Sequence, residues 1–470
     1  MSLWTSEEIK LATDGKVIGE WVVDGISIDT RNLVKGDLFI ALKDKRDGHD
    51  FVKKAFECGA VAALVSHIPS GLSGDSNIVL VPDVLQALQN MARFSRKRFQ
   101  GKLIAITGSV GKTSTKEMLK TVLNYQGKTH ASEKSFNNHW GVPLTLARMP
   151  SNTEYAILEL GMNKSGEIRQ HSLLSKPHVA LITSVNMVHM SSFKNLGEIA
   201  LAKSEIFDGL VENGTAIVNS DIEPLEIVKK TFADCNGLLV TFGKNVADWK
   251  LNSIKTNDHS ISVFATQNQN DFNFELISLG EHFALNSLAV LAVVNSLKLD
   301  LATAITSFKS WRPLTGRADV SIVNLNDDDP NSYFSLIDDS YNSNPTSLKA
   351  GIVLLNNLYE SKAFKERGNK IVILGDMLEL GEEEETIHQE IAKWPELKGV
   401  RHFYLVGSLM KNLYDILPNH INKMWFESST ELSSKMIKLV NNNDIVLVKG
   451  SKKSRMSEVA TMLKNISVSD

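Results

Sequence analysis

The sequence lacks several features that would mark a secreted or membrane-embedded protein. Only two cysteines, Cys58 and Cys235, occur in 470 residues, too few for a disulfide framework or a zinc cluster. Nowhere do about 18 apolar residues follow one another, which argues against a membrane-spanning helix. The first ten residues carry Glu7 and Glu8 and have no apolar core, so no secretory signal is predicted. We therefore expect a cytoplasmic protein.

An excess of charge of one sign is also missing. The 51 Lys and Arg residues nearly balance the 54 Asp and Glu residues, which leaves a net charge of -3. This balance gives no reason to expect nucleic acid or an anionic membrane as the main partner. The chain is also longer than one hydrophobic core usually serves, so two or three domains are expected.

Short apolar segments alternate with helix-like segments along most of the chain. Ten of them are strand candidates, namely residues 38–42, 62–66, 77–81, 103–107, 155–160, 179–185, 215–219, 370–375, 402–407 and 444–450. Such alternation is typical of parallel sheets joined by crossover helices, so an α/β fold is predicted. Residues 92–101 and 311–317 interrupt the pattern, and they divide the chain into expected domains at 1–98, 99–313 and 314–470.

One glycine of the common nucleotide-binding loop is absent. The pattern G-x-x-x-x-G-K-[ST] would place its first glycine where this chain has Ile106, and only the shorter G-x-x-G-K-T remains, from Gly108 to Thr113. Bare backbone N–H groups at the two glycines can point at phosphate oxygens. Lys112 can then reach the terminal phosphates, and the Thr113 hydroxyl can ligate Mg²⁺ at the start of a helix. The structural alternative is a plain glycine turn between a strand and a helix.

Three downstream side chains could complete a metal-nucleotide site. Glu159 ends an apolar strand candidate, where parallel sheets present functional groups, although it could also be a solvated strand end. His189 follows another such strand, and a single histidine is more often structural than a ligand. Lys203 lies among aliphatic residues of a predicted helix, where the alternative is a surface lysine whose stem covers apolar neighbours.

Several motifs together resemble the Mur ligase family, and the resemblance covers nearly the whole chain. The matching segments are residues 26–65, 106–119 (ITGSVGKTSTKEML), 135–146 (SFNNHWGVPLTL), 159–168 (ELGMNKSGEI), 188–190 (VHM), 202–207 (AKSEIF), 312–319 (RPLTGRAD), 337–352 and 373–392. The last two are similar to segments of the members that add D-alanyl-D-alanine to UDP-N-acetylmuramoyl-tripeptide. The resemblance also accounts for Ile106, because the family uses a short phosphate loop.

The resemblance implies an ATP-dependent ligase of peptidoglycan precursor synthesis that forms a C–N bond and releases ADP and phosphate. It implies an N-terminal UDP-sugar-binding α/β module, a central phosphate-loop ATPase-like domain with a mainly parallel sheet, and a C-terminal Rossmann-like domain. UDP-N-acetylmuramoyl-tripeptide and D-alanyl-D-alanine are the expected substrates, and ATP and two Mg²⁺ ions the expected cofactors. A monomer without nucleic acid or membrane insertion is expected.

The resemblance also implies roles for individual residues. The expected catalytic residues are Lys112, Lys203, His189 and Arg317, with Lys203 carbamylated, and the expected metal ligands are Thr113, Glu159, His189 and Lys203. The nucleotide is expected at Gly108, Ser109, Val110, Gly111, Lys112, Thr113, Ser114, Asn286, Arg317 and Asp339. The substrates are expected at Asp29, Thr30, Arg31, His49, Asn137, Asn138, Tyr341, Asn342 and Asn344, while turn chemistry is a plain alternative for the neighbouring Gly48 and Asp50.

The chain departs from the family pattern at two places. Phe283 stands where the adenine segment G-x-H-N-x-x-N has its first asparagine, so base recognition must rest on Asn286, backbone groups or stacking. After His189 the chain reads MSSFKN, without the acid and the glycine that relatives commonly show.

Other functions remain open from the sequence. Relatives that add diaminopimelate or lysine, and folylpolyglutamate synthetases, typically carry a histidine before the Asn-Pro region, whereas this chain has Tyr341 to Pro345 and no D-N-P-[RA] signature. Another Mur-type or folylpolyglutamate synthetase-like ligase is thus one alternative. A phosphate-loop switch or kinase, in which nucleotide binding drives a partner, is the other.

Overall fold

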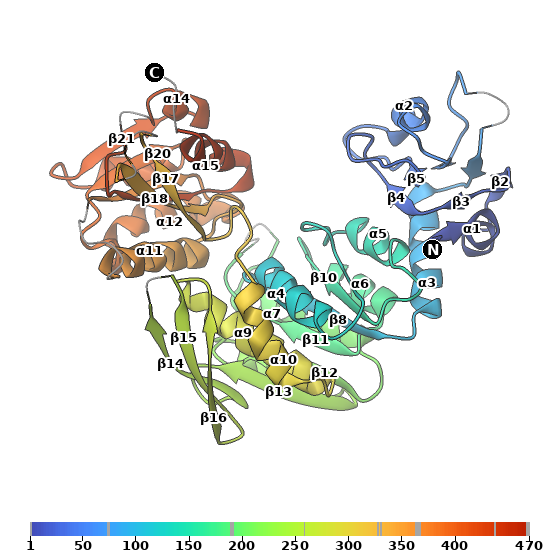
Figure 1. Ribbon diagram of the computed structural model, residues 1–470, viewed down its shortest axis with the longest axis horizontal. Coiled ribbons are helices and arrows are strands. Elements are labelled where there is room, and N and C mark those ends of the chain that lie inside the picture. The colour runs from blue at the N-terminus through green and yellow to red at the C-terminus, as the bar shows by residue number, and fades with distance from the viewer. Residues whose placement is uncertain are drawn as a thin grey trace.

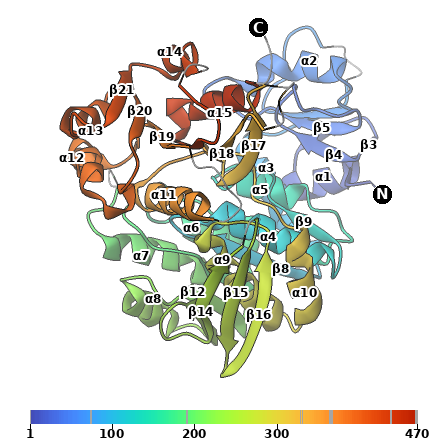
Figure 2. The same cartoon turned by 60° about the vertical axis from the view of Figure 1, so that its left-hand side comes forward.

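The structure, a computed structural model, describes residues 2–72, 76–188, 192–257, 259–326, 329, 331–361, 368–436 and 439–466. Three lobes follow one another along the chain, and each is built on its own sheet (Figure 1). The middle lobe lies between the other two, and Figure 2 shows the same arrangement from another side. The predicted α/β fold with three sheet-based lobes is confirmed.

The N-terminal lobe has a five-stranded sheet in the order β2-β7-β6-β5-β4. Its strands are β2 (Lys16–Ile18), β4 (Gly25–Ser27), β5 (Asp37–Ile40), β6 (Ala62–Val65) and β7 (Ile78–Leu80), beside a small ladder of β1 (Trp4–Thr5) and β3 (Val22–Val23). Its helices are α1 (Ser6–Thr13), α2 (Val52–Glu57) and α3 (Val84–Arg98). The Trp4 indole N–H donates to the Ala147 carbonyl of the middle lobe at 2.8 Å. This hydrogen bond joins the N-terminal lobe to the middle lobe.

The middle lobe has a nine-stranded sheet in the order β16-β15-β14-β13-β12-β11-β8-β10-β9. Seven neighbouring strands of this sheet are parallel to one another. They are β8 (Lys102–Thr107), β9 (Thr129–Ala131), β10 (Tyr155–Glu159), β11 (Val179–Ile182), β12 (Gly214–Asn219), β13 (Gly237–Gly243) and β14 (Trp249–Thr256). The antiparallel strands β15 (Ile261–Gln267) and β16 (Asn270–Leu276) extend it. Parallel order gathers the carboxyl ends of β8, β10 and β11 at one edge, where ligands bind in such sheets.

Helices cover both faces of the middle sheet. They are α4 (Lys112–Asn124), α5 (Gly141–Ala147), α6 (Glu167–Ser175), α7 (Leu196–Ser204), α8 (Leu225–Phe232), α9 (Glu281–Ser296) and α10 (Leu301–Ser307). α9 is apolar nearly all round and packs against α4, β12, β13 and β14, which places it inside the lobe. Because α4 follows the phosphate loop directly, this packing fixes the loop against the sheet edge.

The C-terminal lobe has a six-stranded sheet in the order β17-β18-β22-β19-β20-β21. Its strands are β17 (Asp319–Asn324), β18 (Tyr333–Asp339), β19 (Lys370–Gly375), β20 (His402–Val406), β21 (Asn422–Phe426) and β22 (Ile445–Lys449), all parallel except the edge strand β17. Its helices are α11 (Pro345–Glu360), α12 (Glu384–Glu390), α13 (Met410–Ile416), α14 (Ser429–Ser433) and α15 (Met456–Lys464).

All ten strand candidates contain strands of the structure, but other strands were not predicted from the sequence, among them β13, β18, β21 and the antiparallel extension of the middle sheet. In β15 and β16 buried residues alternate with more exposed ones, and polar side chains such as Asn273 and Glu275 interrupt the apolar pattern. A search for continuous apolar runs finds strands buried on both faces and misses strands with one solvated face. Among the described residues, no helix has the length and apolar character needed to cross a membrane.

Candidate active site

The phosphate loop sits at the carboxyl end of β8 and is braced by the segment after β11. Gly108 has φ +152° and Gly111 has φ +85°, backbone angles that favour glycine. A Cβ on Gly108 would lie 2.0 Å from the Thr183 hydroxyl, so the close approach also requires glycine there. The Ser184 hydroxyl accepts from the Val110 N–H at 2.8 Å, and the Ser184 carbonyl accepts from the Ser109 N–H at 3.0 Å.

The first turn of α4 offers the free donors that an anion needs. The N–H groups of Lys112, Thr113 and Ser114 open the helix and have no partner within it. Gly111 is the N-cap and supplies no capping side chain. The loop and the positive end of the helix dipole therefore form an anion site.

Glu159 and Thr113 meet beside this helix start. The Thr113 hydroxyl donates to Glu159 Oε2 at 2.8 Å, and the Asn137 amide donates to Glu159 Oε1 at 2.8 Å. Glu159 is only 1% exposed, which excludes the solvated strand end that the sequence left open. A hydroxyl and a buried carboxylate thus share one corner of the loop.

Two lysines approach each other at the same edge. Lys112 bends back to the carbonyls of Gly108 and Ser109. Burial lowers the pKa of Lys112, and the Arg317 charge adds to this while Glu159 opposes it. Burial also holds the pKa of Lys203 well below the ordinary lysine value, and the charge of Lys112 lowers it further. Lys203 is 2% exposed, so it is not a surface lysine.

Lys116, on α4, is a third buried lysine and was missed by the sequence reasoning. Its ammonium donates to the carbonyls of Ser132 and Lys134, both at 2.6 Å, and pairs with Glu117 at 2.8 Å. The Ser132 hydroxyl in turn accepts from the Glu159 N–H at 3.3 Å. The lysine therefore ties the chain after β9 to the phosphate-loop helix. The sequence does not set Lys116 apart, because α4 carries two further lysines, Lys112 and Lys120.

Arg317 brings the C-terminal lobe to the phosphate loop. Its guanidinium donates to the Ser135 hydroxyl at 3.3 Å, and that hydroxyl lies 3.4 Å from the Thr113 hydroxyl. The guanidinium also lies over the Tyr341 ring, 4.1 Å from its centroid. Ser135 was not predicted as a site residue, because a single serine in a loop does not indicate a function by its type or spacing.

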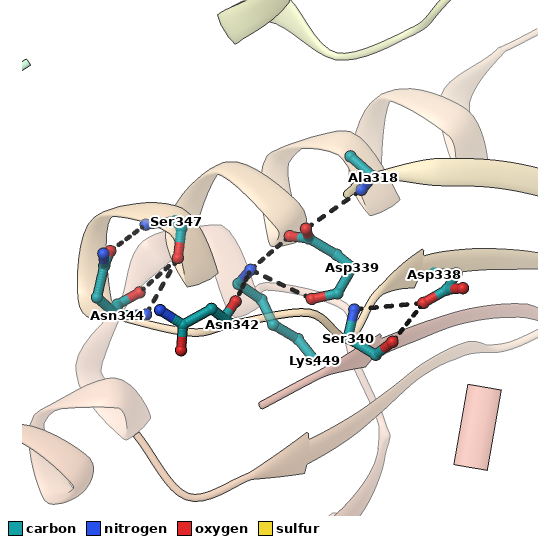
Figure 3. Close-up of polar contacts among 8 residues, drawn as sticks. All are labelled: Ala318, Asp338, Asp339, Ser340, Asn342, Asn344, Ser347 and Lys449. Carbon is teal, nitrogen blue, oxygen red and sulfur yellow. Dashed lines mark hydrogen bonds and ion pairs between the residues drawn. The ribbon is translucent and has the colours of Figure 1, made fainter. Parts of the chain in front are cut away.

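Asp339 at the end of β18 is held by a lysine from β22, as Figure 3 shows. Lys449 pairs with Asp339 Oδ2 at 2.6 Å and donates to the Asn342 carbonyl at 3.0 Å. Burial raises the pKa of Asp339, and the Lys449 charge opposes that shift. The other carboxylate oxygen accepts from the Ala318 N–H at 3.2 Å, next to Arg317. Asp339 and Arg317, both expected at the nucleotide, thus lie together.

Two of the asparagines expected at the substrate act as local caps. Asn344 is the N-cap of α11 and accepts from the Ser347 N–H at 2.9 Å (Figure 3). Asn138 accepts from the Gly141 N–H at 2.9 Å at the start of α5. Each side-chain oxygen is therefore already used, whereas the side chain of Asn342 is exposed. Their part in substrate binding stays a prediction.

The expected adenine segment forms the start of α9. Phe283 is fully buried, with its ring 4.0 Å from the His282 ring and 4.9 Å from the Trp311 ring, so it belongs to the core. Burial lowers the pKa of His282 to about 4, and the nearby Lys449 contributes. Asn286 lies against the phosphate loop, and its amide nitrogen is buried without a hydrogen-bond partner among the described residues. That orphaned donor fits an acceptor on a ligand.

The residues expected at the UDP-sugar lie in the N-terminal lobe. Asp29 and Arg31 form an exposed ion pair at 2.6 Å, and the Arg31 hydrogen bond lowers the pKa of Asp29 to about 2. Thr30 lies between them. The buried His49 contacts Asp47 through Nδ1 at 2.6 Å, and its Nε2 accepts from the Ser66 N–H at 2.9 Å. Both ring nitrogens of His49 are therefore occupied. The imidazole is not free to act as a base toward the Ser66 hydroxyl, so we do not read this group as a nucleophilic site.

The remaining expectations are the metal ligands. His189 lies outside the described residues, as does part of the divergent segment that follows it. In the part of the chain that the structure describes, no three His, Cys, Asp or Glu side chains form a group that could hold a metal ion. At the loop itself, the described oxygen donors that meet are the Glu159 carboxylate and the Thr113 hydroxyl.

Comparison with known proteins gives matches over nearly the whole chain. A family description of the Mur ligase middle domain matches residues 106–294, and one of the Mur ligase glutamate ligase domain matches residues 327–452. The UDP-N-acetylmuramoyl-tripeptide--D-alanyl-D-alanine ligase of Rickettsia prowazekii is 33% identical and covers 97% of this chain and 99% of its own. That of Bacillus subtilis is 34% identical over 93% of this chain and 92% of its own.

A solved structure agrees with these relatives. The crystal structure of MurF from Acinetobacter baumannii superimposes with a TM-score of 0.83 at 27% identity, covering 98% of this chain and 99% of that one. The three-lobed arrangement is therefore shared over nearly the full length of both chains.

Proposed function

The chain belongs to the Mur ligase family, and from this premise we propose that it joins D-alanyl-D-alanine to UDP-N-acetylmuramoyl-tripeptide, with ATP converted to ADP and phosphate. The product is a precursor of peptidoglycan. The relatives that cover nearly the whole chain carry the name of this ligase, which favours it over ligases for other amino acids. The observation that carries the proposal is the contact of Arg317 with Ser135 beside Thr113, because it brings the C-terminal lobe to the phosphate loop.

The residues of the phosphate loop fit a nucleoside triphosphate. The N–H groups at the start of α4 form one anion site, and the Lys112 ammonium lies against the carbonyls of the same loop. Asn286, whose Oδ1 lies beside Gly111, has a buried amide nitrogen without a hydrogen-bond partner among the described residues. Arg317 and Asp339 add a cation and a hydrogen-bond acceptor from the C-terminal lobe. We place the phosphates along the loop and the ribose near Asp339.

The residues also fit Mg²⁺, which prefers oxygen ligands and usually keeps several from water and phosphate. Thr113 and Glu159 would hold one ion, and Glu159, His189 and Lys203 a second. Bound there, the ions would neutralise the crowded anions during phosphoryl transfer.

Lys203 suits this second site only as a carbamate. A protonated lysine cannot ligate a cation, but burial and Lys112 favour the neutral amine of Lys203. A neutral amine can add carbon dioxide and release a proton to water, which leaves an anionic carbamate with oxygen donors.

The side chains then have separate tasks in the reaction. The carboxylate of the tripeptide attacks the terminal phosphate of ATP and becomes an acyl phosphate, while ADP leaves. Lys112 and Arg317 stabilise the charge on the transferring group. The D-alanyl-D-alanine amine next attacks the acyl carbon, forms the C–N bond and releases phosphate. Because Arg317 comes from another lobe, the lobes must stay closed during transfer.

The finer assignments follow from the same proposal. We place the sugar nucleotide at Asp29, Thr30, Arg31 and His49, the acceptor chain near Asn137 and Asn138, and the dipeptide near Asn342 and Asn344. We keep the domain limits at 1–98, 99–313 and 314–470, and we propose a cytoplasmic monomer.

An ATP-to-ADP assay tests the proposal. The purified protein is incubated with ATP and Mg²⁺, with UDP-N-acetylmuramoyl-tripeptide and D-alanyl-D-alanine added singly and together. We expect sustained ADP release only when both are present, with the pentapeptide product detected by mass. An ADP release rate that is the same with and without the two substrates would indicate a phosphate-loop switch or another ligase.

A further inference from the structure

We propose that Tyr341 is a positioning residue whose ring holds Arg317 at the phosphate site, a role that rests on the proposed function. The ring and the guanidinium meet face on, with the Arg317 Cζ atom 4.1 Å from the ring centroid. At this distance the attraction between cation and ring is strong enough to select one direction for a long side chain. The Tyr341 ring would therefore act through Arg317 and not on the dipeptide.

The backbone on both sides makes this pairing rigid. The Tyr341 N–H donates to the Gly316 carbonyl at 3.0 Å, which ties the two segments together. Arg317 lies between Gly316 at φ +79° and Ala318 at φ +57°, so its direction is set by a tight turn of left-handed residues. Non-glycine residues rarely adopt such angles unless the surroundings enforce them. Here the Ala318 N–H is held by Asp339 at 3.2 Å.

A ring holds the cation without neutralising it. Among the described residues no carboxylate forms an ion pair with Arg317, and Asp339 is paired with Lys449 at 2.6 Å. Among the described residues, the guanidinium contacts the ring and the Ser135 hydroxyl, the latter at 3.3 Å. A carboxylate in place of the ring would compete with phosphate for the same charge. The full charge is thus kept for the transferring group.

The ring also offsets a repulsion. Arg317 contacts the Ser135 hydroxyl, which lies 3.4 Å from the hydroxyl of Thr113, the residue after Lys112, so the two cations repel each other across the loop. Without a platform, the flexible arginine would turn toward solvent. The Tyr341 hydroxyl has no hydrogen-bond partner among the described residues, so the fold uses the ring face and leaves the oxygen unused.

Four variants test the role: Tyr341→Phe, Tyr341→Leu, Arg317→Ala, and the last two combined. We expect Tyr341→Phe to keep kcat within about twofold of the parent, since the ring remains. Tyr341→Leu should lower kcat about three- to thirtyfold, the range of a cation–ring contact, with KM for D-alanyl-D-alanine unchanged. In the Arg317→Ala background, Tyr341→Leu should lower kcat no further. Should the leucine variant fail to fold, Tyr341→Met takes its place.

Binding of a non-hydrolysable ATP analogue, measured by calorimetry, supplies a readout that needs no turnover. We expect Tyr341→Leu to weaken it as Arg317→Ala does, and Tyr341→Phe to leave it unchanged. If the parent performs no ligation, the proposed function fails, and this arm still decides the role of the ring. A raised KM for the dipeptide in Tyr341→Phe, a Tyr341→Leu effect that persists without Arg317, or analogue binding unaffected by Tyr341→Leu would each overturn the proposal.

Discussion

Replacing Lys116 by methionine should show how strongly the fold depends on one buried cation beside the loop. The fully buried ammonium donates to two carbonyls, those of Ser132 and Lys134, each at 2.6 Å. A hydrogen bond from a charged donor contributes about 1.5–3 kcal/mol, and removing one partner of a buried ion pair costs about 3–5 kcal/mol. The methionine regains some apolar packing, so we expect a net loss of about 3–5 kcal/mol.

That loss should be visible in thermal unfolding. For a lobe of this size, 1 kcal/mol corresponds to about 2–4 °C, so the transition of the middle lobe should fall by about 6–20 °C. Turnover of the folded fraction should also drop, by about 100-fold, because the segment that carries Ser132 and Ser135 would lose its anchor beside Glu159.

Lys120→Met is the matched control. Lys120 lies one turn further along α4, is partly exposed and has no hydrogen-bond or ion-pair partner among the described residues. The same substitution there should change stability by no more than about 0.5 kcal/mol. A difference of about 2 °C between the unfolding temperatures of Lys116→Met and Lys120→Met corresponds to about 1 kcal/mol. If the difference is smaller than this, the buried contacts of Lys116 do not contribute as argued.

Three further predictions concern the loop and its surroundings. Lys112→Ala should abolish ADP release in the ligation assay while the unfolding temperature stays near the parent's; near-normal release would refute its role at the phosphate. Lys203→Ala and Lys203→Arg should both lose ligase activity, and acetate at high concentration should restore part of it to the alanine variant only; an active arginine variant would exclude the carbamate. Phe283→Asn should destabilise the protein by about 3–5 kcal/mol in thermal unfolding, because the ring is packed against His282 and Trp311, whereas tighter ATP binding without a stability loss would contradict this placement.

Local patterns of the chain were sufficient to predict much of the fold. Strands buried on both faces read as apolar runs, so candidates such as residues 103–107 and 179–185 were found without any tertiary information. The glycines and the lysine of the phosphate loop were also readable, because a left-handed backbone and an anion site each demand particular residues in sequence. Glu159 and Lys203 were found as candidates, but whether they were buried was left open.

Side chains that act over short distances were harder to interpret. Asn138 and Asn344 match the family's motif positions, yet each accepts a hydrogen bond from a backbone N–H in the first turn of the helix that follows, α5 or α11. The same amide can cap a helix or bind a ligand, and the sequence of these loops does not separate the two roles. From the sequence, Phe283 was interpreted as a lost contact to the adenine base. Only its packing against Trp311 in the structure identifies it as a core residue.

The tertiary structure alone decided which distant groups meet. Lys116 reaches carbonyls 16 and 18 residues away, and Arg317 reaches a serine 182 residues away. Such contacts depend on the order of strands in a sheet and on how one lobe lies against the next, and no local propensity encodes either. The sequence by itself therefore determined the loop, its helix and the family, through residue types at short spacing. The burial of Lys203 and the joining of Tyr341, Arg317 and Ser135 were set by packing between segments far apart in the chain.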